Sequence, residues 1–277
     1  MLEGACDCHT HVIGPAGAYP MVAQRHYTPG PAPVDALRSH LSALGFQRVV
    51  VVQPSVYGTD NRCLIDTLAG MGGAARGVAV LPDDVGDAAL EALHAHGVRG
   101  VRVNLESESE RDPDAARAQV LHWTRRVAGL GWHVQLYVAR TVIEVMTDLL
   151  ANSVAPVVLD HFALPGQPPG EVVRDTRLTD LLATGRVHLK LSAPYRLPHD
   201  SIANAWAELL IRSVPAALLW GSDWPHTARD PGAAPHQISS YRSIPSSSLH
   251  AQIERWMPTP ELLQRILVDN PAALYGF

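Results

Sequence analysis

The sequence predicts a single domain over residues 1–277 with an α/β fold, a (β/α)8 TIM barrel. Eight short apolar runs recur along the chain, each followed by a helix-like stretch, which is the pattern of alternating strands and helices. A length of 277 residues is typical of one such barrel. No glycine-rich phosphate-binding turn follows the first run, which disfavours the alternative, a doubly wound open sheet. Strands are expected at 5–12, 48–53, 77–81, 98–105, 133–138, 156–161, 187–192 and 217–223.

The order of elements follows from local signals. The four valines at 49–52 form a continuous apolar run, as expected of a parallel strand buried on both faces. Several amphipathic segments stop at a glycine (Gly45, Gly97, Gly131 and Gly185), the usual residue after a helix. Helices are expected at 34–44, 88–96, 115–129, 141–150, 178–184 and 202–211. Proline- and glycine-rich loops at 14–33, 164–170 and 230–235 follow strand ends, where a barrel builds its active site.

Composition excludes several classes of protein. Apolar residues make up 47% and charged residues 18% of the chain, which is enough for a large core and is not typical of disorder. The net charge of −5 and the lack of a basic run argue against nucleic acid as a partner. No apolar run is long enough to span a membrane, and the N-terminus lacks the features of a signal peptide. Three cysteines form no disulfide framework, so we expect a cytoplasmic protein with reduced thiols.

The first strand carries the most informative motif, Asp7-Cys8-His9-Thr10-His11. Side chains alternate between the two faces of a strand, so Asp7, His9 and His11 are expected on one face, and Cys6 and Cys8 on the other as core packing. Two adjacent imidazoles form a metal site, an acid/base site, or an electrophilic clamp on a carbonyl group.

Other strand ends supply further polar groups to the same barrel mouth. Buried charges are costly unless they are paired or used, so this concentration predicts a functional site. Each residue also has a purely structural interpretation: His161 as a satisfied polar residue, Asp223 as a helix cap, and Arg102 as an ion-pair partner. The strand ends carry Gln53, Ser55, Arg102, Asn104, Gln135, Tyr137, Asp160, His161, Lys190, Ser192 and Asp223.

Taken together, the motifs resemble the amidohydrolase superfamily. The His-x-His strand, the Asp160-His161 strand end and the Trp-Gly-Ser-Asp-Trp-Pro-His segment at 220–226 carry the resemblance. Further matches, including Arg25-His26-Tyr27-Thr28-Pro29 and Lys190-Leu191-Ser192, point to the amidohydrolase 2 branch that contains 2-pyrone-4,6-dicarboxylate lactonases. The resemblance covers essentially the whole chain.

The resemblance implies roles for particular residues. It implies a catalytic cluster of four residues, with Asp223 as general base and the imidazoles of His9, His11 and His161 on the carbonyl oxygen. It implies that Tyr27, Ser55, Arg102, Tyr137 and Arg196 bind the substrate's carboxylates and ring. No metal is required in this branch, although His9, His11 and Asp223 offer suitable ligands for one divalent ion, Zn²⁺ or Mn²⁺. The bridging lysine usual on the fourth strand of the superfamily is absent here.

The expected activity is hydrolysis of a carboxylate-bearing lactone, either 2-pyrone-4,6-dicarboxylate-like or muconolactone-like, in aromatic or sugar-acid catabolism. Glu106, Glu108, Glu110 and the Ala163-Leu164 pair stand where the branch has basic residues, so substrate choice is expected to depend on these loops. Three alternatives stay open: a sugar-lactone isomerase, a metal-dependent decarboxylase, and a non-catalytic barrel that binds an organic acid. The expected partner is a small-molecule lactone or organic acid; the oligomeric state is not predicted.

Overall fold

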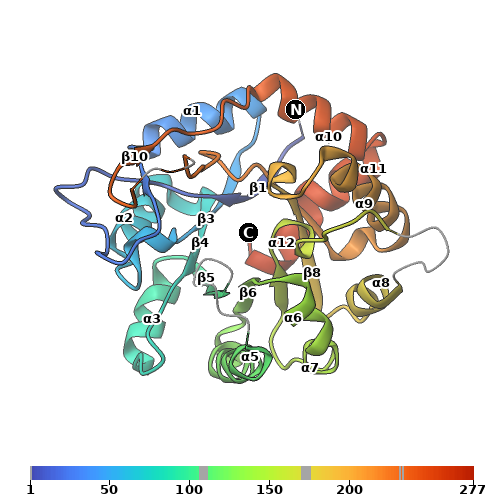
Figure 1. Cartoon of the computed structure of the whole chain (residues 1–277), viewed down its shortest axis with the longest axis horizontal. Helices are drawn as coiled ribbons and strands as arrows, with labels where there is room; N and C mark the ends of the chain where they lie inside the picture. The colour runs from blue at the N-terminus through green and yellow to red at the C-terminus, as the bar shows by residue number, and fades with distance from the viewer. Residues whose placement is uncertain (1, 106–111, 170–175, 231, 233) are drawn as a thin grey trace.

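The computed structural model describes residues 2–105, 112–169, 176–230, 232 and 234–277. Eight parallel strands pair in the order β1-β3-β4-β5-β6-β7-β8-β9, which confirms the predicted (β/α)8 barrel (Figure 1). The strands of the barrel are β1 (Cys6–Thr10), β3 (Arg48–Val52), β4 (Ala75–Ala79), β5 (Val98–Asn104), β6 (His133–Tyr137), β7 (Val157–Leu159), β8 (Val187–Ser192) and β9 (Leu218–Gly221).

Hydrogen bonds close the sheet beyond the ends of β1 and β9. The His11 amide donates to the Trp224 carbonyl at 2.7 Å, and the Asp223 amide donates to the His9 carbonyl at 2.9 Å. This seam joins the first predicted motif to the last one, more than 200 residues later in the chain. Barrel closure therefore brings Asp223 beside the two histidines.

Helices surround the barrel, and their apolar faces pack on the outward-facing side chains of the strands, such as Val49 and Val51. Helix α1 ends at Gly45 in the left-handed conformation, as its sequence predicts, and α5 begins at Pro113, where the Asp112 carboxylate caps the Asp114 amide. The α-helices are α1 (Val34–Leu44), α2 (Arg62–Met71), α3 (Asp87–Ala95), α5 (Pro113–Val127), α6 (Arg140–Val145), α7 (Thr147–Ala151), α8 (Thr176–Ala183), α9 (Asp200–Ser213), α10 (Ser246–Trp256), α11 (Pro260–Gln264) and α12 (Asn270–Tyr275).

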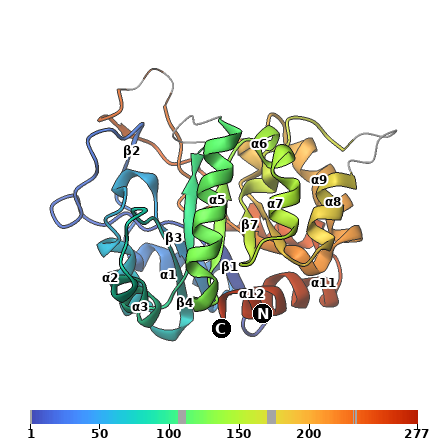
Figure 2. The ribbon, with the colours of Figure 1, turned by 90° about the horizontal axis from the view of Figure 1, so that it is seen from below.

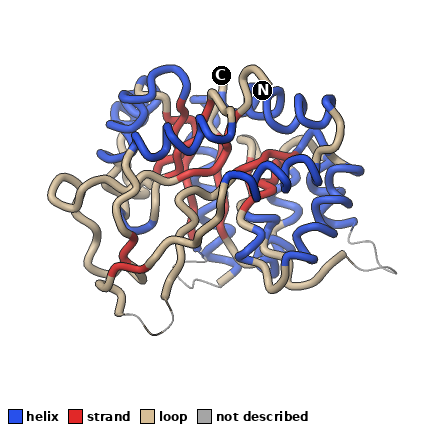
Figure 3. Tube along the Cα trace, turned by 90° about the horizontal axis from the view of Figure 1, so that it is seen from above, coloured by secondary structure: helices blue, strands red, loops and turns tan. Residues whose placement is uncertain are grey.

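The two ends of the barrel differ. Both chain termini and α12 lie at one end (Figure 2), and Tyr275 packs there against Cys6, Cys8 and Val50 inside the barrel. The short pair β2 (Thr28–Pro29) and β10 (Ile238–Ser239) lies with the long loops toward the opposite end (Figure 3). This second end is where the strands finish, and it carries the polar side chains.

Three expectations about the elements are wrong. The segment 141–150 is not one helix, because the chain bends at Met146 between α6 and α7. Helices α2, α10, α11 and α12 were not among the expected helices, and β4 begins two residues before the expected run at 77–81. No helix among the described residues is long and apolar enough to cross a membrane.

Candidate active site

A small polar cavity of about 80 Å³ lies at the end of the barrel where the strands finish. All five residues that are predicted to bind substrate line it, together with two of the predicted catalytic histidines. Beneath its floor lie His9 and Asp223, both fully buried. The lining consists of His11, Tyr27, Pro54, Ser55, Arg102, Tyr137, His161, Arg196 and Thr227.

Two of the predicted catalytic residues sit on backbone that L-residues rarely adopt. Asp223 follows β9 with φ 61°, and His161 begins a short 3-10 turn after β7 with φ 49°. Such left-handed conformations cost of order 1–3 kcal/mol and persist where the surroundings enforce them. Two backbone hydrogen bonds hold the turn at Asp223. Its amide donates to the His9 carbonyl, and the His226 amide donates to the Asp223 carbonyl. The backbone itself therefore aims both side chains into the barrel.

Asp223 is the carboxylate at the centre of the site. Its Oδ1 lies 3.5 Å from His9 Nε2 and 3.4 Å from His11 Nε2. Its Oδ2 accepts from Tyr195 Oη at 2.7 Å and from Arg196 Nε and Nη2 at 3.0 and 2.8 Å. Burial opposes ionisation, but the charge of Arg196 outweighs it and holds the pKa of Asp223 well below its ordinary value. Asp223 is therefore ionised, with one oxygen neutralised by Arg196 and the other facing two imidazoles.

A second buried carboxylate, Asp160, lies below the first. Its Oδ1 is 3.3 Å from His9 Nδ1 and 3.6 Å from Lys190 Nζ, and its Oδ2 accepts from Gln135 Nε2 at 3.1 Å. Arg102 Nη2 lies 3.6 Å from the same Oδ2. Burial raises the pKa of Asp160, but the charge of Lys190 outweighs it and lowers that pKa well below its ordinary value. His9 is thus held between two carboxylates, one on each side of its ring.

His9 and His161 are neutral near pH 7, because burial lowers the pKa of His9 well below its ordinary value and that of His161 to about 3. His11 Nδ1 lies 2.8 Å from the Val52 carbonyl oxygen, which can only accept, so Nδ1 carries a proton. In its neutral form, His11 therefore presents the Nε2 lone pair to the site. His161 Nδ1 lies 2.8 Å from Ser192 Oγ, which accepts or donates.

The spacing of the same residues would allow a single divalent cation. His9, His11 and Asp223 bring their ligand atoms within 4.8 Å of one another, and so do His9, Asp160 and His161. His9 Nε2 and Asp223 Oδ1 are buried and lack a hydrogen-bond partner among the described residues. Three N/O ligands with an open fourth position are the usual donor set of a catalytic zinc site, and the Nδ1 contact of His11 with a backbone carbonyl is typical of a metal-ligating histidine.

The alternation of the strand predicts Asp7 and His9 on the same face, but the structure places them on different faces. Strand β1 is irregular between Asp7 and Thr10, and such a bulge changes the face on which the following side chains lie. Asp7 accepts from Ser222 Oγ at 2.5 Å and lies 3.4 Å from His40 on α1, outside the barrel. Cys6 and Cys8 are instead buried inside it; both are free thiols used in core packing, as predicted.

Some functional candidates had no sequence role assigned. Tyr195 bonds Asp223, Thr227 accepts from Arg196 at 3.1 Å, and Lys190 contacts His9. Lys190 was visible as a polar strand end, but its partner was not. The predicted role of Glu106, Glu108 and Glu110 falls outside the described residues.

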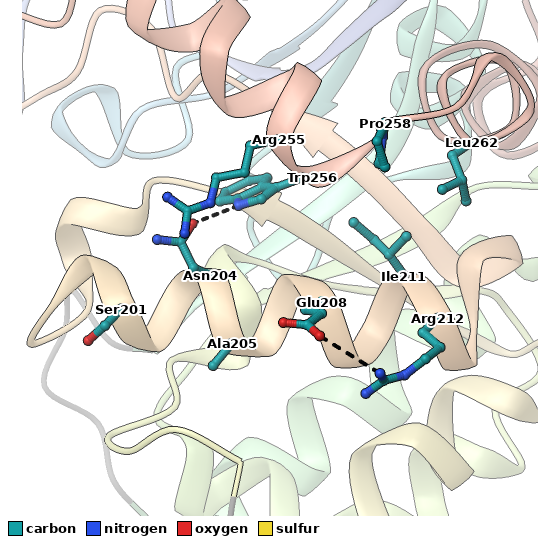
Figure 4. A pocket seen from close by; sticks show the side chains of 10 residues that line it. All are labelled: Ser201, Asn204, Ala205, Glu208, Ile211, Arg212, Arg255, Trp256, Pro258 and Leu262. Carbon is teal, nitrogen blue, oxygen red and sulfur yellow. Dashed lines mark hydrogen bonds and ion pairs between the residues drawn. The ribbon is translucent and has the colours of Figure 1, made fainter.

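A wider groove of about 580 Å³ lies outside the barrel, between α9 and the segment from α10 to α11 (Figure 4). Its polar walls are satisfied locally: Trp256 donates to Asn204 Oδ1 at 2.9 Å, and Arg212 pairs with Glu208 at 3.8 Å. The barrel mouth, in contrast, contains buried polar atoms without partners. The chemistry of the chain is therefore concentrated at the mouth.

Comparison with known proteins shows what the whole chain is similar to. The amidohydrolase family model matches residues 6–277. A 2-pyrone-4,6-dicarboxylate hydrolase from Comamonas testosteroni is 35% identical over 293 residues, covering 98% of this chain and 90% of the relative. A 4-sulfomuconolactone hydrolase from Rhizobium radiobacter is 31% identical over 287 residues, covering 99% and 90%. The solved structure of a candidate 2-pyrone-4,6-dicarboxylic acid hydrolase from Pseudomonas putida superposes with a TM-score of 0.79 at 32% identity, covering 100% of this chain and 98% of that one.

Proposed function

We propose, from the premise that this chain belongs to the amidohydrolase family, that it is a hydrolase that opens a carboxylate-bearing lactone. The observation that carries the proposal is the contact of one buried carboxylate, Asp223, with two imidazoles and with Arg196 at a polar cavity. The lactone hydrolases among the relatives support the reaction type. The substrate class is a pyrone or muconolactone acid.

In the proposed reaction, Asp223 accepts a proton from water, whose oxygen attacks the lactone carbonyl carbon. His9 and His161 are neutral imidazoles that each carry one N–H, and they donate to the oxyanion of the tetrahedral intermediate. The ring C–O bond then breaks, and the proton held by Asp223 passes to the leaving oxygen. The product is an open-chain acid with one additional carboxylate.

Arg196 controls the strength of the base in this proposal. A carboxylate clamped by a guanidinium is a weak base, since its pKa lies far below the working pH. Arg196 is also the cavity-lining cation that is 22% exposed in its side chain, so it can reach a bound ligand. We therefore expect the substrate carboxylate to draw Arg196 away from Asp223 Oδ2. This one change binds the substrate and also makes Asp223 a stronger base.

The reaction as written requires no metal. A divalent ion, if bound, would be held by His9, His11 and Asp223 and would supply Lewis-acid polarisation of the carbonyl. In that case His11 would ligate through the Nε2 lone pair that its contact with Val52 leaves free. Without an ion, His11 can donate a hydrogen bond to the oxyanion only as an imidazolium, because the Nδ1 proton of the neutral ring faces the Val52 carbonyl oxygen.

The test is a panel of pyrone and muconolactone acids in H₂¹⁸O, with and without a chelator and with metal analysis of the protein. We expect turnover that survives chelation, with one ¹⁸O in the new carboxylate. Conversion to another lactone without ring opening would identify an isomerase instead. Loss of CO₂ that depends on bound zinc or manganese would identify a decarboxylase, and thermal stabilisation without turnover would identify a binding protein.

Replacement of the base gives the matched test. Asp223→Asn is expected to lower kcat by several orders of magnitude, because the amide cannot accept the proton from water. Asp148→Asn is the control and should keep full activity, because Asp148 lies on α7 in an exposed ion pair with Arg117 of α5. Near-normal turnover by Asp223→Asn would exclude Asp223 as the base.

A further inference from the structure

Lys190 is the only lysine of the chain. Of the 22 lysine and arginine residues, the other 21 are arginines. Lys190 stands on β8 with a side chain that is fully buried inside the barrel. Burial of a cation is costly, and arginine presents a wide planar fork where lysine presents a compact charge on a flexible stem. The single lysine at this position therefore indicates that the site requires a compact cation whose N–H donors can point in different directions.

The surroundings of Lys190 Nζ provide two hydrogen-bond acceptors and one ion-pair partner. Nζ lies 2.6 Å from Gln135 Oε1, 3.3 Å from His9 Nδ1 and 3.6 Å from Asp160 Oδ1. An ammonium group has three donors and no acceptor. The buried carboxylate of Asp160 supplies the opposite charge that keeps the ammonium in place.

The contact with His9 has a consequence for the proton on its ring. Because an ammonium only donates, His9 Nδ1 must accept, and the single proton of the neutral ring lies on Nε2. Nε2 is the atom 3.5 Å from Asp223 Oδ1 that has no partner among the described residues. A protonated Nε2 donates to an oxyanion at that place but cannot ligate a metal.

We propose that Lys190 is a positioning residue that fixes His9 as the Nε2–H tautomer and so makes the site a hydrogen-bond donor cluster rather than a metal centre. Asp160 Oδ1, 3.3 Å from His9 Nδ1, is the competing acceptor. Without Lys190, His9 Nδ1 donates to Asp160, and the Nε2 lone pair turns toward His11 and Asp223, as a metal ligand requires. The inference rests on the proposed function for the oxyanion that Nε2 faces, whereas the tautomer itself is independent of any substrate.

The direct test is NMR of the whole wild-type protein labelled with ¹⁵N-histidine and ¹⁵Nζ-lysine. The single lysine gives one side-chain signal, which reports whether Nζ is an ammonium. The His9 ring is assigned by its absence in His9→Gln. We expect an ammonium signal and a His9 ring protonated on Nε2. A neutral amine, or a ring protonated on Nδ1, would overturn the proposal, whether or not the protein hydrolyses lactones.

Variants test the consequence for metal binding. Lys190→Met is expected to bind Zn²⁺ about 10–100-fold more tightly than the wild type, the range by which groups behind the ligands change metal affinity. In the absence of zinc its kcat should fall while KM stays near normal, because Lys190 does not line the cavity. Arg186→Met, an exposed cation just before β8, is the control and should change neither property.

Loss of Lys190 leaves Asp160 without its ammonium, so the single variant is accompanied by Lys190→Met/Asp160→Asn, which removes both buried charges. The double variant is expected to fold, to show the His9 ring without a fixed proton position, and to lose kcat as the single variant does. Zinc affinity equal to wild type in both variants, or a kcat unchanged by either, would refute the positioning role.

Discussion

Arg196 should decide which lactones are turned over, because it neutralises Asp223, the proposed general base, in the absence of substrate. Three donors hold Asp223 Oδ2, and two of them are Arg196 nitrogens at 3.0 and 2.8 Å. An arginine beside a carboxylate lowers its pKa by about 1–3 units, which corresponds to roughly 1.4–4 kcal/mol. A substrate carboxylate that attracts Arg196 removes this lowering of the Asp223 pKa and so makes Asp223 a stronger base. A neutral lactone does not attract Arg196 and leaves Asp223 a weak base.

The perturbation is Arg196→Met, assayed with a lactone acid and with the neutral lactone of the same ring. For the acid, kcat/KM should fall about 30-fold or more, because an anchoring charge pair costs roughly 2–5 kcal/mol when one partner is removed. For the neutral lactone, kcat should rise by up to about 10-fold, since the pKa of Asp223 returns toward the working pH. Arg212→Met, which removes an exposed arginine paired with Glu208 on α9, serves as the control.

The dependence of kcat/KM on pH tests independently whether Arg196 lowers the pKa of Asp223. In the wild type the pKa of Asp223 is lowered, so the base stays ionised down to low pH and kcat/KM shows no acid limb from it. In Arg196→Met the pKa rises, and an acid limb should appear as the pH falls through the new value. If the variant loses activity equally on both lactones and its profile stays flat, the proposed release of the base by substrate is refuted.

Two further predictions concern single contacts and the whole fold. Ser192→Ala should lower kcat about 3–10-fold, because a neutral hydrogen bond that orients His161 contributes roughly 0.5–1.5 kcal/mol; an unchanged kcat in steady-state assays would show that His161 is oriented by packing alone. Burial lowers the pKa of His133 and of His161 to about 3, below the value of about 6.5 in an unfolded chain. The unfolded chain then binds more protons as the pH falls below 6.5, so the free energy of unfolding should drop by about 2 kcal/mol for each histidine between pH 7 and pH 5. Urea unfolding at the two pH values measures this drop, which His133→Gln should reduce by about 2 kcal/mol, and equal stability at both would contradict neutral burial of these rings.

The sequence predicts the barrel and the placement of the cluster because both follow from strand periodicity. Polar residues at strand ends meet at one mouth in any (β/α)8 barrel, so His9, His11, His161 and Asp223 could be brought together without coordinates. The face of Asp7 could not be predicted, because a bulge in β1 depends on pairing with β3 and not on the residues of β1 alone.

Contacts between side chains of distant segments could not be predicted from the sequence either. Arg196 was expected to bind substrate, and its pairing with Asp223 depends on how the short turn η5 (Pro194–Arg196) packs beside the end of β9. Lys190 was recognised as a polar strand end, but its distance to His9 is set by the barrel's diameter and strand stagger. Periodicity gives the direction of a side chain, whereas the identity of its partner requires the closed barrel.

The two cations that hold the buried carboxylates differ in a way that fits their proposed roles. Lys190 is fully buried and holds Asp160, while Arg196 keeps 22% of its side chain exposed and holds Asp223. A buried cation cannot leave its carboxylate without leaving an uncompensated charge, whereas an exposed one can exchange it for a ligand. With Arg102 beside Asp160, these five charged groups carry one net positive charge. One substrate carboxylate balances that charge, so a lactone with a single carboxylate in the buried pocket, and any second acid group directed outward, matches the electrostatics of the site.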